Sequence, residues 1–181
     1  MVEYSANGGV IMKKISIVHL ENNSDNKKIL TNLIIKDTQK KCFGVDDPDE
    51  PEKLYTPEEM AESFFEDDEF DIFGINYDNK YIGMLSIHDG IVGIFIEPEY
   101  QRRGFAKKAL LMFEKMALEN YKCNELIAEI ISDNQASINL FSNLGYEYNE
   151  QYNSPMNGVN ATFLKYKKVL SNNQKNITQI I

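Results

Sequence analysis

Residues 91–118 carry the clearest pattern of apolar and polar positions in the chain. The first six, residues 91–96, are apolar at every position, which predicts a strand buried on both faces. Pro98 cannot donate to a strand ladder and helps to end this strand. From Phe105 onward, apolar residues recur at steps of three and four, which predicts an amphipathic helix. A short polar turn, residues 101–104, joins the two elements.

The rest of the chain repeats such patterns at regular intervals. We expect strands at residues 15–20, 70–77, 81–88, 91–96, 125–131, 146–152 and 161–168, and helices at about 25–41, 57–65, 105–118 and 135–144. Ser24 and Asp25 are the expected cap of the first helix, and Thr56, Pro57 and Glu59 have capping-box spacing for the second. Residues 42–55 and 153–160 are expected to be loops.

These elements predict an α/β protein. Its core is a central mixed, mostly antiparallel sheet of about seven strands with four helices. The passage from strand 91–96 through a helix to strand 125–131 implies that the fourth and fifth strands pair in parallel. A single domain is expected over residues 12–170. Residues 1–11 show no periodicity and are expected to be a disordered extension, with Met12 as an alternative start, and residues 171–181 are expected to be a flexible tail.

The charge is acidic and unevenly distributed. The net charge is −9, and residues 46–71 hold 13 acidic residues against one basic residue, Lys53, leaving 15 acidic and 18 basic residues elsewhere. Such a field repels nucleic acid and would attract a cationic substrate, although a solvated acidic loop and helix face is the alternative. No apolar run is long enough for a membrane span and no secretory signal is present, so we expect a cytoplasmic protein without a membrane partner. Cys42 and Cys123 lack metal-ligand spacing, and no metal site is expected.

The polar turn has the chemistry of an anion site. A helix N-terminus presents unpaired N–H groups and a partial positive charge, and phosphate is its usual ligand. Gly104 lets the backbone approach such a ligand, and Ala106 is too small to block it. Arg102 and Arg103 add positive charge in an otherwise acidic chain. An ordinary strand–helix turn with solvated arginines is the alternative.

Two motifs give this turn a specific meaning. The first is Gln101-x-x-Gly104-x-Ala106, which follows the run Glu97-Pro98-Glu99-Tyr100. It resembles the acyl-CoA signature of the GNAT superfamily of N-acetyltransferases. A second block resembles the second GNAT motif, and it stands at Asn134, Ala136, Leu140, Phe141, Gly145 and Tyr146. The resemblance covers roughly residues 15–168 and is weakest before Phe70.

The resemblance implies a GNAT fold and transfer of an acetyl group from acetyl-CoA to a primary amine. The cofactor-binding residues that it implies are Ile94, Phe95, Ile96, Gln101, Arg102, Arg103, Gly104, Phe105, Ala106, Lys107, Asn134 and Phe141. The strand carrying Ile94 and Ile96 would splay from its neighbour and pair with the pantetheine amides. Gly93 is suited to a bulge that causes the splaying, or is a packing glycine. Asn134 would bond the pantetheine, cap a helix, or do both.

The catalytic residues are less clearly indicated. By family analogy the N–H of Ile94 donates to the thioester oxygen as charge develops there. The family's glutamate base falls at Gly90, so His88 and Asp89 are the substitutes, although His88 is equally suited to a half-buried strand position. Phe141 stands where relatives often place a tyrosine acid. Tyr148 is our candidate replacement, with Tyr146 and Tyr152 as others.

Three functions are compatible with the sequence. The first is acetylation of a small amine acceptor, with a cationic one favoured by the acidic segment. The second is acetylation of protein N-termini or lysines. The third is an acyl-CoA-binding regulatory protein without turnover, which the missing glutamate and tyrosine favour. The acceptor is expected to bind within residues 41–70; its identity and the formation of a homodimer are left open.

Overall fold

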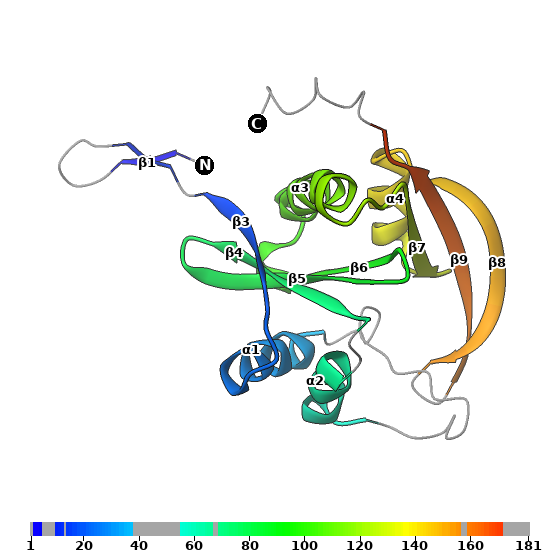
Figure 1. Ribbon diagram of the computed structural model, residues 1–181, viewed down its shortest axis with the longest axis horizontal. Coiled ribbons are helices and arrows are strands. Elements are labelled where there is room, and N and C mark those ends of the chain that lie inside the picture. The colour runs from blue at the N-terminus through cyan, green and yellow to red at the C-terminus, as the bar shows by residue number, and fades with distance from the viewer. Residues whose placement is uncertain are drawn as a thin grey trace.

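The computed structural model describes residues 2–4, 10–12, 14–37, 55–66, 69–156 and 159–171. Seven strands form one sheet in the order β3–β4–β5–β6–β7–β9–β8 (Figure 1). Their bounds are β3 (Ile15–His19), β4 (Asp71–Tyr77), β5 (Lys80–His88), β6 (Ile91–Ile96), β7 (Glu125–Ile131), β8 (Glu147–Met156) and β9 (Val159–Val169). Every neighbouring pair is antiparallel except β6 and β7, the fourth and fifth strands of the sheet, which are parallel. The predicted fold class is therefore confirmed.

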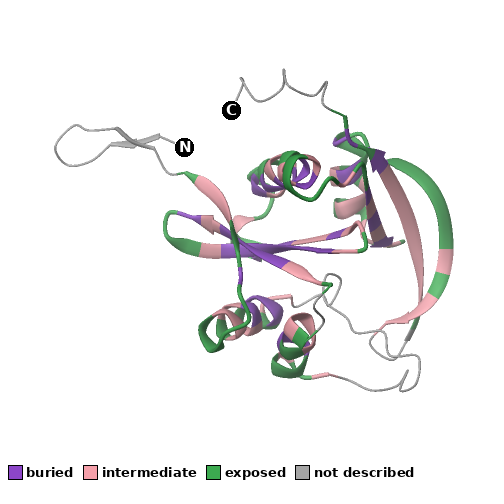
Figure 2. Ribbon diagram, in the orientation of Figure 1, coloured by how far each residue is buried: buried purple, intermediate pink, exposed green. Residues whose placement is uncertain are grey.

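Helices cover both faces of this sheet. In Figure 1, α1 (Ser24–Ile35) and α2 (Pro57–Glu66) lie on one face, and α3 (Phe105–Asn120) and α4 (Gln135–Asn143) lie on the other. Each face has its own apolar cluster: Phe95 packs in the cluster with α1 and α2, and its neighbour Ile96 packs in the cluster with α3. Because alternate strand residues point to opposite faces, β6 must be apolar at successive positions. Figure 2 shows the resulting burial along the central strands.

The helix starts follow the local sequence with one difference. At α2 the expected capping box is present: the Thr56 N–H donates to Glu59 Oε2 at 2.8 Å, and the Glu59 N–H donates to Thr56 Oγ1 at 3.2 Å. At α1 the cap is Asn23 rather than Ser24 or Asp25. Its Oδ1 accepts from the N–H of Asp25 at 3.1 Å and from that of Asn26 at 2.9 Å.

The first helix is shorter than its apolar spacing predicts. It ends at Ile35, whereas the pattern suggested about residue 41. The N–H groups of Lys36 and Asp37 donate to Leu33 O and Ile34 O, at 3.1 and 3.0 Å. These three-residue bonds tighten the last turn and end the helix. Residues 38–54, which include most of the expected loop and much of the acidic segment, lie outside the described residues.

The final strand pair is longer than expected. The loop predicted at residues 153–160 is largely strand, since β8 continues to Met156 and β9 starts at Val159. A proline cannot donate to a strand ladder, which disfavours it inside a sheet. β8 is an edge strand of the sheet, however, where a proline without an N–H is tolerated, and Pro155 is in register with Asn160.

The N-terminal segment contains secondary structure that the sequence pattern does not predict. Disorder is expected for residues 1–11, whereas β1 (Val2–Tyr4) pairs antiparallel with β2 (Val10–Met12). This two-stranded unit is separate from the main sheet. The tail from residue 172 onward lies outside the described residues. None of the helices in the described part of the chain is both long enough and apolar enough to cross a membrane.

Candidate active site

The central feature of the site is the separation of two parallel strands. β6 and β7 share a single register pair, Ile91 with Ile127, and the Ile127 N–H donates to Gly90 O at 2.9 Å. No further pair follows, so β6 and β7 diverge beyond Ile91, as expected. The cause of this divergence is not a bulge at Gly93, because β5 and β6 stay in continuous register. A Cβ on Gly93 would lie 2.7 Å from Ser86 Oγ, so a larger residue here would have to displace that side chain.

The register of β6 directs its free backbone groups into the gap. Asp89 and Gly90 form a two-residue hairpin turn between β5 and β6. In such hairpins the two residues that flank the turn, here His88 and Ile91, are hydrogen-bonded to each other. Because hydrogen-bonded pairs alternate in antiparallel ladders, Ile94 and Ile96 direct their N–H and C=O groups away from β5. They therefore face the side on which β7 has diverged. The C=O of Ile96 accepts from Gln101 Nε2 at 2.9 Å.

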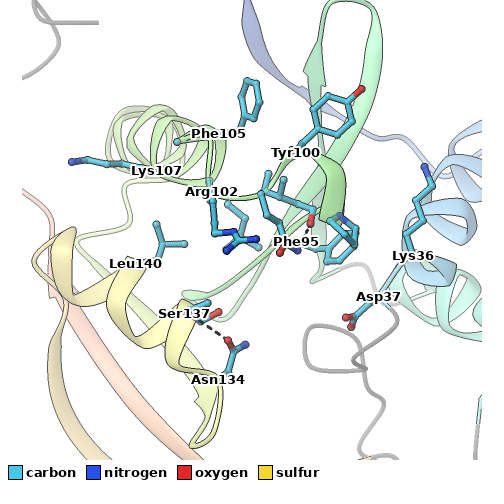
Figure 3. A pocket seen from close by; sticks show the side chains of 17 residues that line it. Lys36, Asp37, Phe95, Tyr100, Arg102, Phe105, Lys107, Asn134, Ser137 and Leu140 are labelled. Carbon is cyan, nitrogen blue, oxygen red and sulfur yellow. Dashed lines mark hydrogen bonds between the residues drawn. The ribbon is translucent and has the colours of Figure 1, made fainter.

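A pocket of about 390 Å³ opens at this gap (Figure 3). It lies between the second half of β6, the N-terminal ends of α3 and α4, and the C-terminal end of α1. Ten of the twelve residues expected to bind the cofactor line it, and these are Ile94, Phe95, Ile96, Gln101, Arg102, Gly104, Phe105, Ala106, Lys107 and Asn134. The wall also includes residues that the motifs did not suggest, among them Lys36, Asp37, Tyr100 and Ser137.

The N-terminus of α3 is open to an anionic ligand. Gly104 is its cap, with φ of 81° and no side-chain hydrogen bond. The Lys108 N–H donates to Gly104 O at 3.1 Å, so the N–H groups of Phe105, Ala106 and Lys107 have no acceptor within the helix. A Cβ placed on Gly104 would meet nothing within 4 Å. The corner is therefore not filled by a side chain, and its geometry suits a phosphate group.

The two arginines of the turn take different positions. Arg102 lines the pocket, with φ of 56°, and Figure 3 shows its guanidinium reaching into the pocket. Arg103 is not on the wall and packs over the rings of Tyr100 and Phe105, 5.3 and 5.1 Å from their centroids. Only Arg102 is therefore placed to contact a ligand in this pocket.

Two residues of the second motif also differ in position. Asn134 lines the pocket and caps α4, where its Oδ1 accepts from the Ser137 N–H at 3.2 Å. The cap role expected for Asn134 is thus confirmed, and its side chain also lies where a ligand would pass. Phe141 is 3% exposed and packs edge-to-face on Tyr146 with centroids 4.9 Å apart. It is not among the residues of the wall.

A buried carboxylate ties α1 to the end of β6. Glu97, directly after β6, is 2% exposed and accepts hydrogen bonds from Lys36 Nζ and, at 3.3 Å, from Lys80 Nζ. Lys80 also donates to Glu99 at 2.8 Å and to the Tyr100 hydroxyl at 3.3 Å. The bond to Glu99 raises the pKa of Lys80, and Lys80 in turn lowers the pKa of Glu99. An acidic residue right after an apolar strand was the sequence signal for this network, but nothing in the sequence named Lys36 as its partner.

The three candidate catalytic side chains lie off the pocket wall. His88 ends β5, stacks on Phe70 with centroids 4.4 Å apart, and places Nε2 3.5 Å from Glu69 Oε2. Asp89 is exposed in the adjoining turn. Ligand atoms of Glu69, His88 and Asp89 lie within 4.8 Å of one another, a spacing that a metal ion could bridge, although exposed acidic groups often gather without one. Tyr148, on β8, is 55% exposed and contacts Tyr166. Their catalytic roles stay predictions.

Comparisons with solved structures place the fold among acetyltransferases. A structure titled as a probable acetyltransferase is 19% identical, with a TM-score of 0.66 over 87% of this chain and 97% of that one. A Salmonella typhimurium acetyltransferase, which modifies the N-terminal serine of ribosomal protein L7/L12, is 13% identical, with a TM-score of 0.70 over 87% and 95%. Vibrio cholerae spermidine N-acetyltransferase, solved with CoA and spermine, is 14% identical, with a TM-score of 0.68 over 86% and 94%.

The sequence itself points to the same family. No curated protein sequence matches this chain. The profile of the acetyltransferase (GNAT) family, however, matches residues 33–146, a range that contains β6, the turn at residues 101–104, Asn134 and Tyr146. That range covers more than half of the 181 residues. The chain therefore belongs to the GNAT acetyltransferase family.

Proposed function

We propose that this protein transfers an acetyl group from acetyl-CoA to a primary amine of a small molecule by direct attack. The proposal depends chiefly on one observation: the gap beside β6 and the open N-terminus of α3 meet in one pocket. A diphosphate and a chain of amides are parts of the same cofactor, so one continuous site must recognise both. Backbone groups of β6 and α3 suit these two parts respectively.

The chain's own residues would hold the cofactor as follows. The N–H groups of Phe105, Ala106 and Lys107 face the diphosphate, with the Arg102 side chain adding a fixed charge. The pantetheine amides pair with the backbone of Ile94 and Ile96 as an added strand would. Bound there, acetyl-CoA supplies an activated thioester.

Acyl transfer then requires three things from the protein. The N–H of Ile94 donates to the carbonyl oxygen as negative charge develops on it, and one preorganised donor of this kind contributes about 3 kcal/mol. The amine nitrogen bonds to the acyl carbon as the carbon–sulfur bond breaks, and the amine proton passes to a base, for which His88 or Asp89, acting through water, is our proposal. The departing thiolate needs little acid, since thiols have pKa values near 8.5.

A small, cationic acceptor is proposed because residues 46–71 are strongly acidic. The pocket is bounded by α1 as well as by α3 and α4, and Glu97 holds the α1 end in place. Among proteins of this fold, the Vibrio cholerae enzyme is named for spermidine and the Salmonella one for a protein N-terminus. Both acceptor classes therefore belong in the test.

The test measures release of free CoA thiol from acetyl-CoA with polyamines, amino sugars, amino acids and peptides as acceptors. We expect turnover with at least one small primary amine and formation of the acetylated amine by mass spectrometry. Turnover with peptides alone would replace our proposal with protein acetylation. Tight CoA binding without acceptor-dependent thiol release would show a binding protein instead.

A further inference from the structure

We propose that Glu129, on β7, binds the amine group of the acceptor beside the gap between β6 and β7, and that Tyr152 positions its carboxylate. This inference rests on the proposed function and names the residue that recognises the acceptor next to the site of transfer. The wall of the pocket does not include Glu129, so this group is separate from the residues expected to hold the cofactor.

The ladder between β7 and β9 places the backbone of Glu129 at the edge of the gap. The Ser132 N–H donates to Thr162 O at 2.9 Å, which marks this as a hydrogen-bonded pair at the end of the ladder. Hydrogen-bonded pairs alternate along an antiparallel ladder, so the pair Glu129–Lys165, three positions earlier, is a non-hydrogen-bonded one. The N–H and C=O of Glu129 therefore point away from β9, toward β6.

Glu129 is level with the part of β6 where transfer is proposed. The register pair of the two strands is Ile91 with Ile127, and Gly93 and Glu129 each lie two residues beyond it. Ile94, whose N–H is the proposed donor to the carbonyl oxygen, is the next residue on β6. Because consecutive residues advance by about 3.3 Å along a strand, Glu129 and Ile94 lie at a similar height on opposite sides of the gap.

The side chain of Glu129 points to the face that carries α1 and α2. Its neighbours Ala128 and Ile130 are buried in the cluster with α3, and alternate residues of a strand point to opposite faces. Gly93 is on the same face as Glu129, since Phe95, two residues further, packs in the cluster with α1 and α2. Because Gly93 has no side chain, β6 presents only backbone on this face at the level of Glu129.

Two donors hold the carboxylate of Glu129. The Tyr152 hydroxyl donates to its Oε2 at 2.7 Å, and Lys165 Nζ lies 3.3 Å from its Oε1. Lys165 is shared with Glu150, whose Oε1 also lies 3.3 Å away, and the Tyr152 ring stacks on Phe163 with centroids 5.5 Å apart. A carboxylate has about four acceptor positions, so two donors leave capacity for the N–H groups of an amine. The Glu129 side chain is 23% exposed, which makes its carboxylate reachable from solvent.

The last two strands of the sheet extend the site on this face. In Figure 1, β8 and β9 continue past the central strands toward α2. They bring Tyr152 and Lys165 to the same side as α1 and α2. An amine that enters from this side therefore meets Glu129 beside the gap, in a carboxylate held for a charge-assisted hydrogen bond.

The experiment compares Glu129→Gln with Glu150→Gln, which removes the same charge from the more exposed partner of the same lysine. Titration calorimetry of 1,4-diaminobutane into CoA-saturated protein reports amine binding without turnover. We expect the diamine to bind about tenfold more weakly in Glu129→Gln, the loss typical of one charge-assisted hydrogen bond. Its affinity should be unchanged in Glu150→Gln, and CoA affinity should hold in both variants.

Kinetics with an amine that is turned over tests both residues. Glu129→Gln should raise KM about tenfold with little change in kcat, and a fall in kcat at constant KM would overturn the binding role in favour of proton transfer. Tyr152→Phe removes the hydroxyl that fixes the carboxylate, so it should raise KM by a smaller factor. Added to Glu129→Gln it should change KM little, because Tyr152 acts through Glu129. Fully additive effects would overturn its positioning role.

The binding measurement separates this inference from the proposed function. The expected calorimetric pattern without any acetylated product would overturn the function and support the role of Glu129. No diamine binding to the unaltered protein, equal losses in Glu129→Gln and Glu150→Gln, or a loss confined to CoA affinity would each overturn that role.

Discussion

The two ends of the pocket are built in different ways. At the α3 end, the groups available to a ligand are mainly backbone N–H groups. They belong to consecutive residues at the start of the helix, directly after the left-handed Gly104. At the α1 end, side chains from α1, from the start of β5 and from the residues after β6 meet around Glu97. The α3 end is thus formed by residues close together in the sequence, whereas the α1 end forms only when distant segments pack together.

The largest effect should come from Gly104→Asp. A side chain at φ of 81° is strained, and a carboxylate there would face the diphosphate. We expect CoA affinity to fall by at least about 100-fold in calorimetry, since one charged contact is replaced by repulsion. Gly145→Asp is the control, because Gly145 has φ of 86° and also nothing within 4 Å. Equal CoA affinity in Gly104→Asp and the unaltered protein would remove the phosphate site.

A smaller effect is expected from Arg102→Gln. It removes the charge that reaches into the α3 end, so CoA should bind about tenfold more weakly, a loss typical of one charge-assisted hydrogen bond. Arg103→Gln removes the same charge one residue later, where the side chain stacks on Tyr100 and Phe105. We expect it to leave CoA affinity nearly unchanged. Equal losses in both variants would show that only general electrostatic attraction matters at this end.

The α1 end is tested by Glu97→Gln. The change removes the buried carboxylate that Lys36 and Lys80 share. We expect the free energy of unfolding, measured by urea denaturation, to fall by about 1 kcal/mol; the fall is small because both lysines are half exposed. The KM for an amine acceptor should rise while CoA affinity holds. Glu99→Gln is the control, since Glu99 meets the same Lys80 at the surface. A drop in CoA affinity alone would show that the two ends are not independent.

The smallest effect concerns Glu114, which helps to hold α3 against β9. Its Oε2 accepts from Lys168 Nζ at 2.7 Å, and burial raises the pKa of this carboxyl from its usual 4.5. A raised pKa in the folded state means that the folded protein holds the proton more tightly than the unfolded chain. The corresponding stability is full below pH 4.5 and is lost as the pH rises through the folded-state pKa.

The measurement is urea denaturation of the unaltered protein and of Glu114→Gln between pH 4.5 and 8. We expect the stability of the unaltered protein relative to the variant to decline as the pH rises and then to level off. A difference that grows with pH would show that the ion pair with Lys168, rather than burial, controls this carboxyl. Little change in CoA affinity is expected, since neither residue lies on the pocket wall.

Local sequence was sufficient for much of the molecule. The strands and helices along the chain, the capping box at Thr56 and the glycine turn before α3 follow from patterns that span a few residues. Each depends on periodicity, on a glycine or proline, or on a cap, and such features act over one or two turns of chain. The parallel pair follows from the strand–helix–strand passage of residues 91–131. Local reasoning predicted a loop where the structure has a strand around Pro155, because β8 lies at the edge of the sheet and an edge strand tolerates a proline.

Only the tertiary structure decided which side chains share the pocket. Arg102 and Arg103 are neighbours of equal charge, yet packing against Tyr100 and Phe105 turns one away. Asp37 and Arg102 are 65 positions apart, and no periodicity links them, but the sheet brings α1 and α3 to opposite walls of one cavity. Sequence patterns report local backbone preference, whereas the composition of a pocket depends on how distant elements pack.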